Sequence, residues 1–158
     1  MQLLLPPDVI TRLIAALDRA GNREIGGILM GEHVAEGEFR VKDLTIQKRG
    51  GTFATFVRVV QDIIGPLRNF FRATNNDYMR FNYLGEWHSH PSFTAVPSDK
   101  DHKTMRDIIE DPEVGANFVT LMVVKLDHDR RLEGTVTVYR PRIKEYMGRL
   151  ILEGNDEQ

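Results

Sequence analysis

The chain has 158 residues, of which 41% are hydrophobic, and its 21 Lys and Arg residues against 23 Asp and Glu residues leave a net charge of −2. These values are typical of one globular domain, and they argue against a disordered chain and against a nucleic-acid-binding protein, which usually has a basic excess. Because the chain has no cysteine, disulfides, cysteine-ligated zinc, iron–sulfur clusters and a cysteine nucleophile are excluded.

The N-terminal residues show no targeting signal. The leucines of residues 3–5 lack a basic flank and are followed at once by Pro6-Pro7, whereas a signal peptide has about 7–15 apolar residues after a positive end. The longest nearly apolar run, residues 118–124, is far shorter than the ~20 residues of a membrane span. We therefore expect a soluble, cytoplasmic protein with no membrane partner.

A helix and a buried strand are the first two predicted elements. Apolar residues recur at helical spacing over residues 10–20, between Pro7-Asp8 and Gly21, which are the expected start and stop signals of a helix. Residues 25–30 are apolar and contain two glycines. They predict a buried strand that another part of the backbone approaches closely, because glycine otherwise weakens a strand.

A second strand and a second helix follow. Residues 39–46 alternate apolar and polar side chains, with a slip near Asp43 that predicts a β-bulge. Residues 59–72 return to helical spacing and should end at the polar residues 75–77. We expect Gly65-Pro66 to break or kink this helix, because proline lacks the N–H that a helix interior uses.

The second half of the chain continues to mix strands and helices. The pattern predicts a strand over residues 81–90, a helix that begins at Ser98, a central strand over residues 118–126 and a strand around residues 136–138. Apolar residues at helical spacing predict a last amphipathic helix over residues 143–151.

This interleaving predicts an α/β fold, with a mixed β-sheet covered by helices. No repeat, low-complexity stretch or long linker divides the chain. We therefore expect one domain over residues 1–153 and a short frayed tail over residues 154–158.

Two of the five histidines stand two residues apart, in the segment EWHSHP at residues 86–91. Side chains on a strand alternate between its faces, so His88 and His90 project from the same face. Their imidazoles can then bind one metal ion, with zinc–nitrogen distances of about 2.0–2.1 Å. Pro91 follows and should end the strand.

Ser98 and Asp101 follow closely and have two interpretations. In the first they only start a helix, with Ser98 as the N-cap and the Asp101 carboxylate reaching back to it. In the second the same geometry holds Asp101 at the carboxyl end of the histidine strand, as a third metal ligand. Two histidines and one carboxylate leave an open position on a tetrahedral zinc ion, which is the mark of a catalytic site.

Such a site also needs a general base, and two glutamates are candidates by position. Glu86 shares the strand face of His88 but is set ~7 Å back along the strand. Glu24 comes just before the first predicted strand and can approach from a neighbouring strand. Position alone leaves the choice open.

Taken in order, these residues resemble the JAMM motif of the JAB/MPN metallopeptidases. The family pattern is a glutamate before an apolar, glycine-rich strand, then H-[ST]-H-P, a six-residue spacer and S-x-x-D. In this chain Glu24 stands in REIGGILMG, HSHP occupies residues 88–91, and Ser98 and Asp101 supply the last element. The resemblance implies the JAB/MPN fold, a cytidine deaminase-like layered domain.

The resemblance also implies a role for each of these residues. His88, His90 and Asp101 would bind Zn²⁺. Glu24 would take a proton from the attacking water and pass it to the leaving amine, and Ser98 would help to stabilise the tetrahedral oxyanion. Glu24 is thereby favoured as the base, and Glu86 is left with a supporting or structural role.

Family members hydrolyse amide bonds, most often peptide or isopeptide bonds after the C-terminal glycine of a ubiquitin-like protein. The resemblance implies the same substrate class here, with the tail lying extended beside the site. Residues 48–56 and 92–96 flank the site in sequence and are the predicted walls of a slot that admits the glycines. Phe53 and Phe93 are predicted to contact the substrate.

The chain is short and is similar to stand-alone bacterial JAB proteins encoded beside E1-like and E2-like enzymes, several of them in anti-phage defence. The implied partners are a ubiquitin-like protein, its conjugates and those enzymes. The alternatives are processing of a sulfur-carrier protein tail, an inactive scaffold or binding module, and a DNA-associated role, against which the net charge of −2 counts. A zinc deaminase is excluded because its site needs P-C-x-x-C.

The remaining singled-out residues receive structural interpretations. We expect Trp87 in the core, His102 at the surface or in support of the site, and His33 and His128 solvated in turns. Several arginines are expected to form a solvated face: Arg58, Arg68, Arg72, Arg80, Arg140, Arg142 and Arg149.

Overall fold

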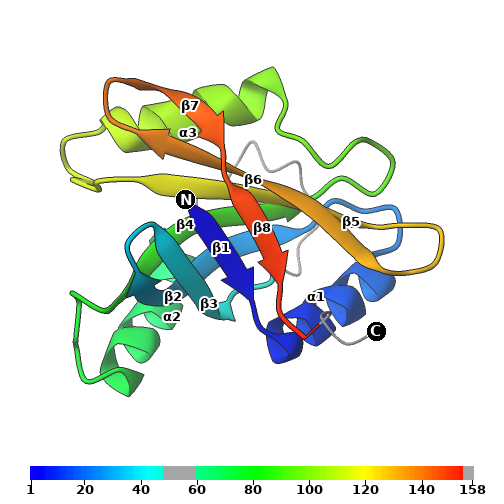
Figure 1. The fold of residues 1–158 in the computed structure, drawn as a ribbon, viewed down its shortest axis with the longest axis horizontal. Coiled ribbons are helices and arrows are strands. Elements are labelled where there is room, and N and C mark those ends of the chain that lie inside the picture. Colours follow the sequence, from blue (N-terminus) through cyan, green and yellow to red (C-terminus); the bar gives the residue numbers. More distant parts are fainter. Residues whose placement is uncertain (48–59, 155–158) are drawn as a thin grey trace.

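The computed structural model describes residues 1–47 and 60–154. Figure 1 shows the arrangement of their elements. In chain order these are β1 (Gln2–Leu5), α1 (Pro7–Ala20), β2 (Gly26–Ala35), β3 (Glu38–Leu44), α2 (Val60–Ala73), β4 (Phe81–Ser89), α3 (Asp99–Glu110), β5 (Val119–Leu126), β6 (Leu132–Arg140), β7 (Ile143–Met147) and β8 (Arg149–Leu152).

One mixed sheet joins the strands in the order β7-β6-β5-β4-β2-β3-β1-β8. The pairs β4–β5, β1–β3 and β1–β8 are parallel, and the others are antiparallel. The two ends of this order, β7 and β8, are separated in sequence only by Gly148. The sheet therefore curls until its two ends meet in one nearly continuous ribbon, which runs across the molecule in Figure 1.

Helices cover both faces of the sheet, as predicted. α1 buries Val9, Leu13 and Leu17 in a core shared with side chains of the sheet. α3 packs Met105 and Ile109 on the opposite face, and α2 packs Phe70 there. Alternate residues of β5 enter the core on each face, which confirms the prediction of a central strand covered on both sides.

Several local predictions are confirmed. α1 begins at Pro7 and ends before Gly21, and α3 has Ser98 as its N-cap. The register of β2 against β3 shifts where Met30 pairs with Asp43 and Gly31 pairs with Val41, so a β-bulge lies next to Asp43.

The close approach predicted at the β2 glycines is seen at Gly27. A Cβ atom there would lie 2.1 Å from the carbonyl oxygen of Thr45. Only a residue without a side chain fits at that point, where Gly27 pairs with Trp87 of β4.

The predicted break at Gly65-Pro66 is wrong, because α2 runs unbroken through Pro66 to Ala73. Proline in a helix interior loses one hydrogen bond, at about 3 kcal/mol. The aromatic face of the helix offsets this loss, since Phe70 is buried against Ile28 and Met30 of β2. The predicted start at residue 59 lies outside the described residues.

The predicted last helix is also wrong, because residues 143–151 form β7 and β8. Without this segment, β6 and β1 would each have backbone N–H and C=O groups along one edge without hydrogen-bond partners. β7 pairs with β6, and β8 pairs with β1. Gly148 makes the change of partner, with its N–H donating to the oxygen of Val136. A Cβ atom at Gly148 would lie 3.1–3.2 Å from its neighbours, so the ribbon passes tightly here.

The sequence interpretation missed β1, the strand of residues 2–5. Its leucines are buried, and the strand lies between β3 and β8 in the sheet. Of the predicted tail, residues 155–158 lie outside the described residues. Within the described part of the chain, no helix is long and apolar enough to span a membrane.

Candidate metal centre

β4 presents the two histidines as the alternation predicted. Trp87 points into the core beneath α1, fully buried, and its indole N–H donates to the Thr45 carbonyl oxygen at 2.8 Å. His88, its neighbour, faces the other side of the sheet, and its side chain is 2% exposed. His90 follows directly after the strand and is 11% exposed. Two imidazoles therefore occupy one face at the carboxyl end of a central strand.

The first turn of α3 brings Asp101 to the same place. The Ser98 hydroxyl accepts from the Asp101 N–H at 3.2 Å, and the Asp101 carboxylate accepts from the Ser98 N–H at 2.7 Å. This capping box confirms the helix-start interpretation. The same carboxylate oxygen, Oδ2, lies 3.5 Å from His88 Nε2 and 3.9 Å from His90 Nε2. The capping box is therefore compatible with the second interpretation, because it places the carboxylate beside both histidines.

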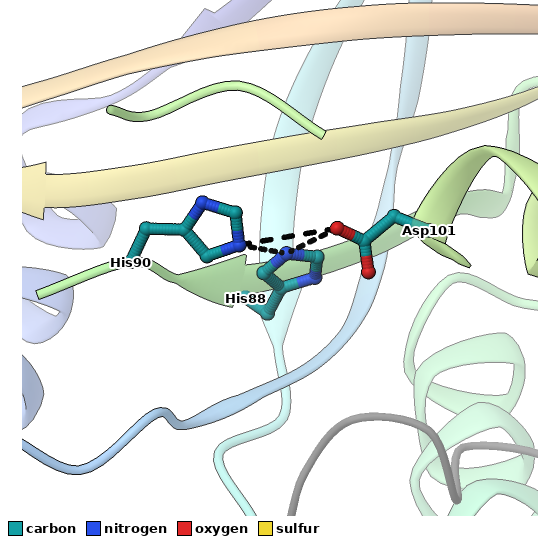
Figure 2. Close-up of side chains that lie close together, drawn as sticks. All are labelled: His88, His90 and Asp101. Carbon is teal, nitrogen blue, oxygen red and sulfur yellow. Dashed lines mark hydrogen bonds and ion pairs between the residues drawn. The ribbon is translucent and has the colours of Figure 1, made fainter. Parts of the chain in front are cut away.

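The three donor atoms form a compact triangle, drawn in Figure 2 with both imidazole edges turned toward the carboxylate. His88 Nε2 and His90 Nε2 are 3.0 Å apart, which completes edges of 3.0, 3.5 and 3.9 Å. Ligands bonded to one tetrahedral zinc ion at about 2.0–2.1 Å lie roughly 3.3 Å apart. The group His88, His90 and Asp101 therefore has the spacing and the chemistry to hold a metal ion.

The protonation of these groups suits metal binding. Burial raises the pKa of Asp101, but the hydrogen bond and charge of His88 and the hydrogen bonds from Ser98 outweigh it, so the pKa falls well below its usual range. The carboxylate is therefore ionised at neutral pH. His90 Nδ1 lies 3.0 Å from the Thr94 carbonyl oxygen. Because only an N–H can satisfy a carbonyl, this contact favours the tautomer of neutral His90 that carries its proton on Nδ1 and turns the Nε2 lone pair toward His88 and Asp101.

The pairing of β2 with β4 brings the segment that contains Glu24 beside the histidine strand. Gly26 pairs with His88, and Ile25 and Ser89 form the next pair. The Ile25 N–H donates to Ser89 Oγ at 3.0 Å, and the Ser89 N–H donates to the Ile25 carbonyl oxygen at 2.8 Å. Glu24 is the residue before Ile25 and is half-buried. It therefore stands next in sequence to the last pair between the β2 segment and the histidine strand.

Ser98 is already engaged in the structure. Its hydroxyl donates to Asp101 Oδ2 at 2.7 Å while it accepts the Asp101 N–H. The group that the resemblance assigns to the oxyanion thus also holds the carboxylate of Asp101, a candidate metal ligand. To reach an oxyanion, the hydroxyl proton would have to turn away from Asp101.

Glu86 lies behind the histidines. Its carboxyl group is 1% exposed and accepts a weak hydrogen bond from the Tyr83 hydroxyl at 3.4 Å. Burial raises the pKa of Glu86 well above its usual range, which favours its protonated form. Glu86 lines a cavity of about 20 Å³ together with His88 and Asp101, and it also borders a larger open pocket of about 990 Å³. A buried acid whose protonated form is favoured fits a structural role better than that of a base.

The other predicted residues are placed as follows. His128 is exposed in a turn as expected, but His33 lies on β2, where it stacks on Phe39 at 5.0 Å between ring centroids, so its placement in a turn was wrong. Phe93 is 65% exposed and its ring meets that of His90 edge-on. The arginines in the described part of the chain are exposed; Arg58, Phe53 and residues 48–56 lie outside it.

Sequence reasoning missed two residues that contact the site segment from β6. The Thr135 hydroxyl donates to the Ala95 carbonyl oxygen, and the Tyr139 hydroxyl lies 2.8 Å from His102 Nδ1. Both follow the site residues by more than 30 positions and read in sequence as ordinary strand residues. The one sequence signal was that Thr135 and Tyr139 are four positions apart, so on a strand their side chains project from the same face.

Comparison with known proteins places the chain in a family. Residues 6–133 match the model of prokaryotic homologues of the JAB domain. No curated protein matches significantly.

Solved structures share the fold at low sequence identity. Protein DSY2949 from Desulfitobacterium hafniense is 16% identical over 96% of this chain and 92% of its own, with a TM-score of 0.66. A protein from Salinibacter ruber is 18% identical over 98% of this chain and 94% of its own, with a TM-score of 0.52. AF2198 from Archaeoglobus fulgidus, a JAB1/MPN domain protein, is 13% identical over 95% of this chain and 98% of its own, with a TM-score of 0.49.

The matched residues include Glu24, both histidines and Asp101, so the family assignment and the donor triangle concern the same part of the molecule. The α/β layers and the mixed sheet are those of the JAB/MPN fold, and the family includes metallopeptidases. The chain belongs to the prokaryotic JAB-domain family.

Proposed function

We propose that this protein is a zinc-dependent peptidase or isopeptidase, which hydrolyses the amide bond after the C-terminal glycine of a ubiquitin-like protein. The observation that carries the metal chemistry is the triangle of His88, His90 and Asp101, with edges of 3.0–3.9 Å at the end of β4. Family members that lack such ligands serve as scaffolds, and this chain retains all three.

Zinc in this site would supply Lewis-acid polarisation of the scissile carbonyl and a nucleophile from water at neutral pH. Glu24 accepts the proton of the attacking water as the new C–O bond forms, and it then donates that proton to the amine nitrogen as the C–N bond breaks. The Ser98 hydroxyl donates to the developing oxyanion. Because water itself attacks, no acyl-enzyme forms, and thiol-alkylating reagents should leave turnover unchanged.

The substrate class rests on the family and on the surroundings of the site. Residues 92–96 form one wall of the proposed slot, next to His90, and they present the exposed ring of Phe93. An extended tail can lie along this wall, and glycines pass where larger side chains would collide with it. The second proposed wall, residues 48–56, lies outside the described residues.

A tail-fusion assay tests this proposal. A ubiquitin-like protein encoded near this gene is fused through its native tail to a reporter, and the products are weighed by mass spectrometry. Cleavage directly after the terminal glycine, which stops with a zinc chelator, supports the proposal. If every cognate fusion survives while a small amide is hydrolysed, the substrate class is wrong and the metal chemistry stands.

The biological setting is proposed from the same reasoning. Neighbouring genes for E1-like and E2-like enzymes would support a conjugation system of the anti-phage type and name the partners. A neighbouring sulfur-carrier gene would instead support tail processing with the same active site. Stoichiometric zinc without any turnover would favour a binding module.

Ser98→Ala should lower turnover more than stability. Loss of an N-cap costs about 1 kcal/mol, whereas loss of an oxyanion donor lowers the rate by about 10²–10³-fold. Urea unfolding and steady-state kinetics on the same sample measure the two effects, and Ser98→Thr, which keeps the hydroxyl, is the matched control. A destabilised variant with normal turnover would show that Ser98 acts only as a cap.

Phe93→Ala should raise KM about tenfold and leave kcat nearly unchanged, because it removes contact area that ground state and transition state share. The side chain is 65% exposed, so the thermal midpoint should stay constant. Met147→Ala, which removes an exposed apolar side chain on β7, is the control. An unchanged KM for the fusion substrate would remove Phe93 from the substrate path.

A further inference from the structure

The turn of α3 that carries Asp101 is bound to β6 by a side-chain contact. His102, the next residue, is half-buried, and its Nδ1 lies 2.8 Å from the hydroxyl of Tyr139, a fully buried residue of β6. The two rings are 5.9 Å apart between centroids. The sequence interpretation left His102 at the surface or in support of the site, and this contact gives it a definite partner.

A second contact holds the same face of the helix one turn further on. Arg106, four residues after His102, lies over the Tyr139 ring at 5.7 Å and donates to the carbonyl oxygens of Arg140 at 3.1 Å and Ile143 at 2.8 Å. Its guanidinium also binds the Glu145 carboxylate. α3 is thus fixed to the β6–β7 hairpin, beside which it lies in Figure 1.

β6 also holds the loop that leads into α3. The Thr135 hydroxyl donates to the oxygen of buried Ala95. Thr135 pairs with Val123 of β5, and Val123 pairs with His88 of β4. This row of paired residues links β4, which carries the histidines, to β6. β6 in turn contacts the chain before Asp101, at Ala95, and after it, at His102.

The capping box alone does not set Asp101 against the histidines. It ties Asp101 to Ser98 within the same segment, so the whole turn could rotate with the box intact. Neighbouring residues on a helix project about 100° apart, and rotation of His102 carries Asp101 with it. The contacts of α3 with the rest of the protein therefore fix the direction of the carboxylate. Met105 and Arg106 act one turn further on, and the His102–Tyr139 contact is the one next to Asp101.

We infer that Tyr139 is a positioning residue for the metal site: its hydroxyl, bonded to His102, holds the first turn of α3 in the rotation that turns Asp101 toward His88 and His90. The inference rests on the proposed metal-binding function and goes beyond it by assigning the Tyr139–His102 pair. It does not depend on the identity of the substrate.

Tyr139→Phe is the first test, because it removes one oxygen and keeps the buried ring. Zinc affinity of the metal-free protein, measured by competition with a chromophoric chelator, should fall about tenfold, in line with partners of metal ligands elsewhere. The absorption of the Co²⁺-loaded variant should also change. Tyr146→Phe, at a half-exposed position of β7, should leave both unchanged, and the thermal midpoint of the metal-free protein controls for folding.

His102 variants test whether the two residues act as one unit. His102→Ala should lose the same factor, and the double variant should lose no more than about twofold beyond either single change, because all three break one bond. His102→Asn places an amide near the position of Nδ1 and should restore most of the affinity.

Each outcome decides between the alternatives. If wild type binds zinc and Tyr139→Phe binds it equally well, or if the two single effects add, the positioning role is overturned and the metal site stands. If wild type binds no zinc, the proposed function and this inference are both overturned.

Discussion

Glu24→Gln is expected to keep its zinc and to lose amide hydrolysis by about 10²–10⁴-fold, the usual contribution of a general base. Glutamine keeps the shape of the side chain but cannot accept the proton of the attacking water. Metal binding should be unaffected, because the donor triangle consists of His88, His90 and Asp101. Turnover of the tail fusion and zinc per chain by elemental analysis measure the two quantities on one preparation.

Glu86→Gln is the matched control for this experiment. Burial raises the pKa of Glu86 and so favours its protonated form, which glutamine copies closely. Its turnover should stay within about threefold of wild type, since no proton acceptor is lost. The opposite result, with an active Glu24→Gln and an inactive Glu86→Gln, would transfer the role of base to Glu86.

Replacement of a metal ligand is expected to remove both zinc and turnover. His88→Ala removes one of the three proposed protein ligands. The His88 side chain is 2% exposed, so water can replace the imidazole only poorly. Asp101→Ala removes the anionic ligand together with the carboxylate half of the capping box. Elemental analysis should find little zinc in either variant, and turnover should fall to background because the nucleophile is lost.

Thermal unfolding gives an independent measure of the same site. A ligand that binds only the folded state stabilises it by about 2.7 kcal/mol at one hundred times its Kd. Added zinc should therefore raise the thermal midpoint of wild type and leave that of His88→Ala unchanged. Asp99→Ala, which alters the neighbouring acid of the same helical turn, and His128→Ala, in an exposed turn, should both respond like wild type. Full zinc occupancy in His88→Ala and Asp101→Ala would refute the ligand assignment.

The donor set was predictable from sequence because each part of it follows from local geometry. The period of two on a strand sets His88 and His90 on one face, and a capping box fixes the side chain of Asp101 within one helical turn. The helix limits of α1, the bulge beside Asp43 and the covered central strand have equally local signals in capping residues, alternation and apolar runs.

Errors arose where local preference and tertiary demand disagree. Helical spacing over residues 143–151 was outweighed by the unpaired edges of β6 and β1, which needed a strand on each side. Pro66 did not end α2, because burial of Phe70 on the sheet offsets a lost hydrogen bond. Residues 2–5 are too few to show a period, and they became a strand because β3 and β8 lie on either side of them.

The sequence by itself determined the α/β class, the candidate metal ligands and the family resemblance, because chemistry and strand or helix periodicity are properties of neighbouring residues. Only the tertiary structure decided how Asp101 meets the histidines, that Ile25, next to Glu24, pairs with Ser89, and that β6 contacts the turn of α3 through Tyr139. These relations join residues that are 11 to 64 positions apart. Their geometry is set by the register of β2, β4, β5 and β6, and register is fixed only when the whole sheet packs against its helices.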